Sequence, residues 1–120
     1  MVQSIGKSHE KRNIFAVHIT ESVVHRQKLS KPKIWLQCLI HAREWISGSV
    51  CQYLAQELVA EHKSGHPQIR ALLAKAEIVL IPVVNPDGYE HSWSKCRLWR
   101  KNLRGSGVDL NRNFDDHWGS

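Results

Sequence analysis

A histidine and a glutamate with metal-binding chemistry stand three positions apart at His41 and Glu44. Imidazole nitrogen and carboxylate oxygen both suit zinc, and a catalytic zinc ion keeps a water molecule on its open coordination position. The spacing alone is unspecific, because a chain with 8 His and 11 acidic residues gives about one such pair by chance. His18 and Glu21 form a second copy, but they belong to an alternating run in which residues three apart face opposite sides of a strand. We therefore expect His18 and Glu21 not to share a metal ion.

An apolar run leads directly into His41. Its length and its β-forming residues predict a strand over 33–40 that is buried on both faces, as in a parallel sheet. In open α/β sheets, ligand sites lie beyond the carboxyl ends of such strands. His41 and Glu44 occupy that place, and they can converge only if the chain turns after Ile40.

A second buried strand and two helices complete the predicted strand–helix–strand unit. The fold class that follows is α/β, with a largely parallel mixed sheet and flanking helices. The parallel arrangement predicts that His41, Glu44 and the turn 85–88 lie on one rim of the sheet. The predicted elements are an entry loop 1–12, a strand 13–20, a connection 21–32, a helix with Ser47 as N-cap and an apolar stripe from Ile46 to Leu58, a helix 68–75 and a strand 77–84.

Length and composition fit one globular domain of 120 residues, with 42% hydrophobic and 23% charged residues. The formal net charge of +6 suits an anionic partner such as a phosphate, a nucleic acid or a ligand with a carboxylate. Three cysteines cannot form a complete disulfide framework. No apolar run approaches the length of a membrane-spanning helix, and the first residues show no signal peptide.

The segment 91–104 concentrates basic residues and tryptophans, and it contains no acidic residue. A charge run of this kind is most often a solvated face. Basic residues interleaved with aromatic ones also suit single-stranded nucleic acid. A third interpretation places the arginines at the rim of the sheet, where they bind a smaller anion. Asn111 and Arg112 likewise fit either a turn or an anion site.

Together these segments closely resemble the zinc metallocarboxypeptidases of the carboxypeptidase A/B type. One matching block would be weak evidence, whereas five blocks in the family's order, spread over nearly the whole chain, are specific. The blocks are 5–8, 40–45, 85–89, 97–101 and 107–114. The resemblance implies zinc-dependent hydrolysis of the C-terminal peptide bond of peptides and proteins, with one Zn²⁺ as cofactor. It also implies an extracellular enzyme with no nucleic-acid or membrane partner.

The resemblance assigns the metal and the oxyanion residues. His41 and Glu44 resemble the first two zinc ligands. Arg100 resembles the catalytic residue that stabilises the scissile carbonyl as it becomes an oxyanion. A fixed cation at that position lowers the barrier by about 3 kcal/mol.

The resemblance also assigns the residues that bind the substrate. Arg43 resembles an outer substrate-binding arginine, and Arg97 an auxiliary contact. Asn111 and Arg112 resemble the pair that binds the terminal carboxylate of the peptide. A planar guanidinium suits that role, because it makes two parallel charge-assisted hydrogen bonds to a carboxylate. Binding the free C-terminus explains the removal of single residues from the end of a chain.

The sequence departs from the family in what lies downstream. The family's third zinc ligand, a histidine, and its general base, a glutamate, follow the matched blocks, and the sequence stops at Ser120 before both. Because a catalytic zinc ion takes three protein ligands, we expect residues 1–120 to form a single partial domain, the N-terminal part of the catalytic domain, which is inactive alone. The alternative is a non-catalytic module that binds anions or peptide C-termini.

Overall fold

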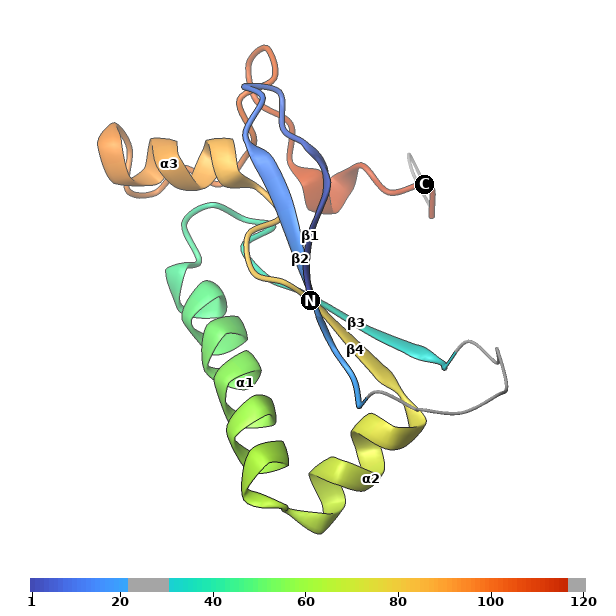
Figure 1. Ribbon diagram of the computed structural model, residues 1–120. Helices are drawn as coiled ribbons and strands as arrows, with labels where there is room; N and C mark the ends of the chain where they lie inside the picture. Colours follow the sequence, from blue (N-terminus) through green and yellow to red (C-terminus); the bar gives the residue numbers. More distant parts are fainter. Residues whose placement is uncertain (22–30, 117–120) are drawn as a thin grey trace.

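The computed structural model describes residues 1–21 and 31–116, and it shows a mixed α/β fold. An open four-stranded sheet in the order β1-β2-β4-β3 carries helices α1 and α2 together on one side (Figure 1). The elements are β1 (Val2–Lys7), β2 (Asn13–Ile19), β3 (Lys33–Gln37), α1 (Trp45–Ser64), α2 (Pro67–Lys75), β4 (Glu77–Ile81), α3 (Pro86–Ser94) and the 3₁₀ turn η1 (Leu110–Arg112).

β3 and β4 pair in parallel, and α1 and α2 connect them. The predicted strand–helix–strand unit is therefore confirmed. Backbone pairing continues beyond both strands, since the Cys38 N–H donates to the Ile81 carbonyl at 2.9 Å and the Asn85 N–H donates to the Leu39 carbonyl at 3.1 Å. The carboxyl ends of β3 and β4 consequently meet at one rim of the sheet, as the sequence predicted.

The other two strand pairings, β1 with β2 and β2 with β4, are antiparallel. The sheet is thus mixed, as predicted, but most pairings among the described strands are not parallel. β1 also contradicts the prediction of an entry loop over 1–12. Every residue of β1 is exposed, so its sequence lacks the apolar alternation that indicates a strand, and backbone pairing with β2 holds it in place. The predicted connection 21–32 lies largely outside the described residues.

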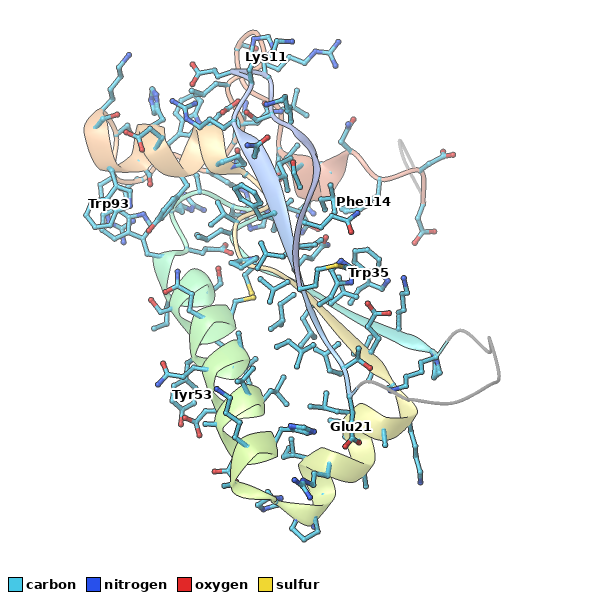
Figure 2. All side chains as sticks on the ribbon, viewed as in Figure 1. Lys11, Glu21, Trp35, Tyr53, Trp93 and Phe114 are labelled. Carbon is cyan, nitrogen blue, oxygen red and sulfur yellow. The ribbon has the colours of Figure 1, made fainter. Side chains whose placement is uncertain are left out.

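β3 is shorter and far more exposed than the predicted strand buried on both faces. All five of its residues are exposed, including Trp35 at 54% (Figure 2). The reason is its position, because β3 pairs with β4 on one side and forms the edge of the sheet on the other. The buried centre belongs to β4, which has four of its five residues buried. β4 ends at Ile81, directly before Pro82, which has no N–H to continue the ladder.

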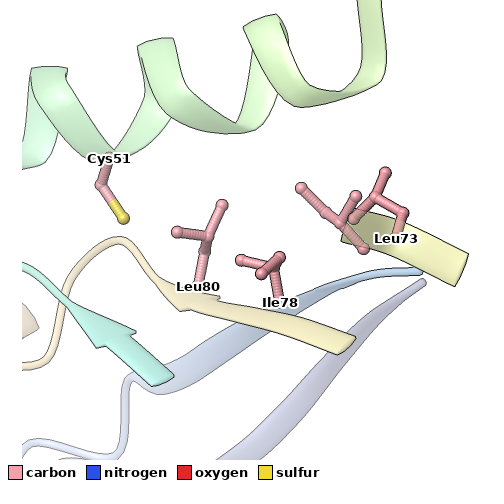
Figure 3. Packing of buried hydrophobic residues seen from close by; sticks show 5 residues of the cluster. Cys51, Leu73, Ile78 and Leu80 are labelled. Atoms are coloured by element: carbon pink, nitrogen blue, oxygen red, sulfur yellow. The ribbon is translucent and has the colours of Figure 1, made fainter. Parts of the chain in front are cut away.

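The main core lies between the sheet and the helices (Figure 3). Cys51 of α1 and Leu73 of α2 pack over Ile78 and Leu80 of β4, and all four are buried. Burial raises the pKa of the Cys51 thiol to about 12, so this cysteine stays protonated at neutral pH. The packing of α1 against β4 thereby fixes where α1 begins relative to the rim of the sheet.

Helix α1 differs from its prediction at its N-terminus and in its apolar stripe. Its N-cap is Glu44, whereas Ser47 lies inside the first turn and accepts a hydrogen bond from the Leu39 N–H at 3.0 Å. Ile46 is 74% exposed, so the predicted stripe only partly faces the core. The end of the helix is as predicted, since Gly65 adopts the left-handed conformation with φ of 89°.

The predicted turn 85–88 instead begins helix α3. Asn85 is the N-cap, and its side-chain oxygen accepts a hydrogen bond from the Gly88 N–H at 3.0 Å. Pro86 suits the first helical position because its missing N–H would have no partner there. Asp87 follows in the first turn, where a negative charge favours the helix. The same residues that indicate a turn therefore also begin a helix.

Asp87 ties this helix to the β1–β2 hairpin. Its carboxylate is 2% exposed and accepts hydrogen bonds from the Ser8 hydroxyl at 2.6 Å, the Glu10 N–H at 2.9 Å and the Arg12 guanidinium at 2.7 Å. Burial alone would raise the pKa of Asp87, but these donors lower it.

The helices in the described part of the chain were also compared with the length and hydropathy of a membrane-spanning helix. None of them meets both requirements.

A hydrogen bond between side chains couples β2 to β4 on the sheet. His18 Nδ1 lies 2.5 Å from Glu77 Oε1, and Lys33 Nζ lies 3.7 Å from Glu77 Oε2. The hydrogen bond with His18 is the main cause that lowers the pKa of Glu77. Because the pKa is lower in the folded chain, this carboxylate stabilises the fold above its unfolded pKa of about 4.3. That contribution is lost as the pH falls through the folded value.

Replacing Glu77 with Gln tests this coupling. We expect Glu77→Gln to lower the free energy of unfolding at pH 7 by on the order of 1 kcal/mol, because it removes the charge that the hydrogen bond favours. The difference from the unmodified chain should shrink below about pH 4.3, where the unfolded carboxyl is protonated. Urea unfolding from pH 7 to pH 3 measures it, and a constant difference across that range would contradict the assignment.

Candidate metal site

The chain reverses direction between the end of β3 and the start of α1. β3 ends at Gln37, and Leu39 adopts a left-handed conformation with φ of 53°. Such a backbone conformation is strained for a residue other than glycine. Leu39 is 3% exposed, and burial together with the Ser47 hydrogen bond holds it. The turn that the sequence required for a His41–Glu44 site is present.

His41 and Glu44 converge after this turn. His41 Nδ1 lies 2.9 Å from Glu44 Oε1. The histidine is buried, with 7% of its surface exposed, while the Glu44 side chain is 46% exposed. The predicted convergence of the two side chains is confirmed. The two atoms lie within hydrogen-bond distance of each other, and their role as metal ligands stays a prediction.

Asp109 completes the surroundings of His41, and the sequence analysis did not select it. Its Oδ1 lies 3.3 Å from His41 Nε2, a buried nitrogen that has no partner in hydrogen-bond geometry. The imidazole therefore lies between two carboxylates, Glu44 at one nitrogen and Asp109 at the other. Histidines that bind metals usually present their second nitrogen to such a group. That rule would have directed a search for a further carboxylate.

Arg100 belongs to the same cluster. Its Nε donates to Asp109 Oδ2 at 2.8 Å, and its Nη1 lies 3.9 Å from Glu44 Oε1. The hydrogen bond from Arg100 is the main cause that lowers the pKa of Asp109, so this carboxylate stays charged. The guanidinium is 27% exposed and reaches the rim. The structure thus brings Arg100 beside the predicted metal pair.

Arg97 lies beside the same loop, but its guanidinium is occupied. It donates to the Arg43 carbonyl at 2.9 Å and lies 3.7 Å from the ring centroid of Trp45. Trp45 in turn stacks on Trp93, with ring centroids 3.8 Å apart, and Trp93 projects outward from α3 (Figure 2). Arg97 therefore fixes the loop, while the Arg43 side chain is exposed. The substrate contacts of both arginines stay predictions.

Asn111 and Arg112 follow Asp109 in η1. Asp109 Oδ1 accepts the Asn111 N–H at 3.0 Å, which caps this turn. Both side chains are exposed, and Arg112 Nη1 donates to the Asn111 carbonyl at 3.1 Å. Their backbone lies next to the cluster, but in the described residues no hydrogen bond or ion pair links either side chain to His41 or Glu44. Their predicted role at a carboxylate stays untested.

The second histidine–glutamate pair diverges, as expected. His18 pairs with Glu77, and Glu21 Oε1 lies 3.6 Å from His62 Nε2. Within residues 1–21 and 31–116, no group of three or more His, Cys, Asp or Glu side chains could hold a metal ion. The assignment of His41 and Glu44 as zinc ligands stays a prediction.

Comparisons with known proteins identify the family of the chain. The sequence matches the zinc carboxypeptidase family, Peptidase_M14, over residues 1–120. It is 38% identical to Carboxypeptidase A6 of Homo sapiens over 121 residues and 42% identical to Metallocarboxypeptidase A of Trichophyton tonsurans over 119 residues. The structure resembles that of thrombin activatable fibrinolysis inhibitor (TAFI), with a TM-score of 0.85 and 34% sequence identity over 100% of this chain.

The chain belongs to the zinc carboxypeptidase family. The two sequence matches cover 96% and 94% of this chain but only 26% and 27% of the relatives' lengths, and the structural match covers 30% of the TAFI chain. The chain therefore spans roughly a quarter to a third of these relatives. Zinc carboxypeptidase activity is a property of the family, and residues 1–120 correspond to one part of its members.

Asp109→Asn tests the carboxylate behind His41. We expect the dissociation constant for zinc to rise about 10- to 100-fold, because the neutral amide no longer orients the imidazole or increases its basicity. Isothermal titration calorimetry with Zn²⁺ at pH 7.5 measures this dissociation constant. Asp115→Asn is the matched control, since it removes the same charge from an exposed position. Equal zinc affinity in both variants would contradict the role of Asp109.

Proposed function

We propose that residues 1–120 are a single partial domain of a zinc-dependent metallocarboxypeptidase, the part that supplies the first two metal ligands and the oxyanion-stabilising arginine. One observation supports this most strongly: His41, Glu44, Asp109 and Arg100 form one connected cluster at the rim where β3 and β4 end. The family's substrates are the C-termini of peptides and proteins, and an extracellular setting follows from the same resemblance.

The residues of the cluster divide the work between them. His41 and Glu44 would hold the zinc ion, and Asp109 would fix the orientation of the imidazole. When bound, zinc polarises a carbonyl and lowers the pKa of a coordinated water molecule. Arg100 is held by Asp109, so its guanidinium does not have to reorganise when negative charge develops on the scissile carbonyl oxygen.

The exposed polar residues around the cluster bind the substrate in this proposal. Asn111 and Arg112 bind the terminal carboxylate of the peptide, which places the last peptide bond near Arg100. Arg43 contacts the chain further from its end, and Arg97 contributes by holding the Arg43 backbone. The net charge of +6 favours the approach of a carboxylate in each case.

A non-catalytic binder of peptide C-termini is the second candidate. It is favoured by the exposure of Arg43 and Arg112, which remain open to an anion without any metal. The two candidates differ in zinc dependence. In the first, peptide binding should strengthen when zinc is present, because a bound zinc ion would act as a Lewis acid toward the peptide carbonyl. In the second, zinc makes no difference.

Zinc titration of the unmodified chain and His41→Ala decides between them. We expect weak zinc binding by the unmodified chain, since only two protein ligands are present, and at least about a tenfold loss in His41→Ala. His66→Ala is the control, because His66 is exposed at the start of α2. Equal binding by the unmodified chain and His41→Ala would remove the metal assignment.

Peptidase assays test the expectation that the chain is incomplete. We expect purified residues 1–120 to release no C-terminal amino acids from peptides in the presence of zinc, because the general base and third ligand of the family are not matched in this sequence. Amino-acid analysis of long incubations measures the release. Turnover that is lost in Arg100→Ala would show instead that these residues suffice for catalysis.

A further inference from the structure

A buried amide lies between the two segments that carry the candidate site. Asn85 is 2% exposed and follows β4 at the rim. Its Nδ2 donates to the Ile40 carbonyl at 3.3 Å and to the Lys101 carbonyl at 3.0 Å. These carbonyls stand directly next to His41 and Arg100 in the chain. One side chain thus joins the backbone of the metal-ligand loop to the backbone of the arginine segment.

The partners of Asn85 fix the orientation of its amide. Two carbonyl oxygens can only accept, and the Gly88 N–H can only donate, so the nitrogen must face Ile40 and Lys101 and the oxygen must face Gly88. Space is equally restricted. A Cβ at Gly88 would lie 2.3 Å from the Lys101 oxygen and 2.5 Å from Asn85 Nδ2. The glycine therefore permits the close approach that the amide needs.

A direct backbone contact lies beside this bridge. The Ala42 N–H donates to the Arg100 carbonyl at 3.1 Å and links the same two segments, two residues after Ile40 and one before Lys101. The Asn85 side chain joins both segments through the carbonyls of Ile40 and Lys101. Without its two donors, these part-buried carbonyls would lose the partner that joins them.

We propose that Asn85 is a positioning residue that sets the separation between the metal pair His41–Glu44 and the Arg100 guanidinium. The proposal rests on the proposed function for the role of these groups, but the bridge itself is a property of the fold. Asn85 touches no reacting atom. Its effect on the site passes through the backbone at Ile40 and Lys101.

Asn85→Asp separates this role from helix capping. A carboxylate has the same shape and still accepts from Gly88, and Asp is a good N-cap, so the start of α3 is retained. The substitution removes both donors and places a negative oxygen against two carbonyl oxygens. Asn102→Asp is the matched control. Asn102 uses only its side-chain oxygen, which accepts from the Arg104 and Val108 N–H groups.

Amide hydrogen exchange measures the bridge without zinc. In Asn85→Asp we expect the exchange rate of the Ala42 amide to rise at least about tenfold relative to that of Val79, a fully buried residue in the central strand β4. The ratio removes any uniform loss of stability. In Asn102→Asp the ratio should not change. An unchanged ratio in Asn85→Asp, or an equal rise in Asn102→Asp, would overturn the proposal.

Zinc affinity connects the bridge to the site. We expect the dissociation constant for Zn²⁺ to rise about tenfold in Asn85→Asp and to stay unchanged in Asn102→Asp. Faster exchange at Ala42 with unchanged zinc affinity would overturn the positioning role and leave a purely structural bridge. If the unmodified chain binds no zinc, the proposed function fails, and the exchange ratio still decides whether Asn85 links the two segments.

Discussion

The parallel pairing of β3 with β4 is the constraint on which the rest of the site depends. Two parallel strands end at the same edge of the sheet. The residues that follow β3 and those that follow β4 are more than forty positions apart in the sequence, and the pairing of the strands brings them together. The pairing does not stop with the strands, because backbone hydrogen bonds continue to Leu39 and Asn85. At that point the chain turns into His41 on one side and into α3 on the other.

Charge alternation then holds the site together. Glu44, His41, Asp109 and Arg100 form a chain in which each carboxylate lies against an imidazole or a guanidinium. Such a cluster fixes the orientation of side chains that would otherwise be mobile at an exposed rim. His41 Nδ1 and Glu44 Oε1 lie against each other within this cluster, and the exposed Glu44 carboxylate lies at its solvent side.

The apolar surfaces of the fold fit a chain that spans about a quarter to a third of its relatives. β3 is an exposed edge strand, and Ile34, Trp35 and Leu36 all lie open to solvent. On α1, Ile46 and Val50 are exposed as well. In a sheet, an uncovered edge with apolar side chains is a surface that further polypeptide can pair with.

The sequence by itself determined the parallel strand unit and the helix ends at Gly65 and Lys75, because apolar runs and breakers are local properties of the chain. Tertiary structure decided which strand is buried and what surrounds His41. Both strands contain an apolar run, over 34–36 in β3 and 78–81 in β4, yet only β4 is buried, since β4 lies between two strands whereas β3 is at the edge of the sheet. Asp109 meets His41, and Asn85 meets the Ile40 carbonyl, only in the folded chain, and no spacing in the sequence encodes either contact.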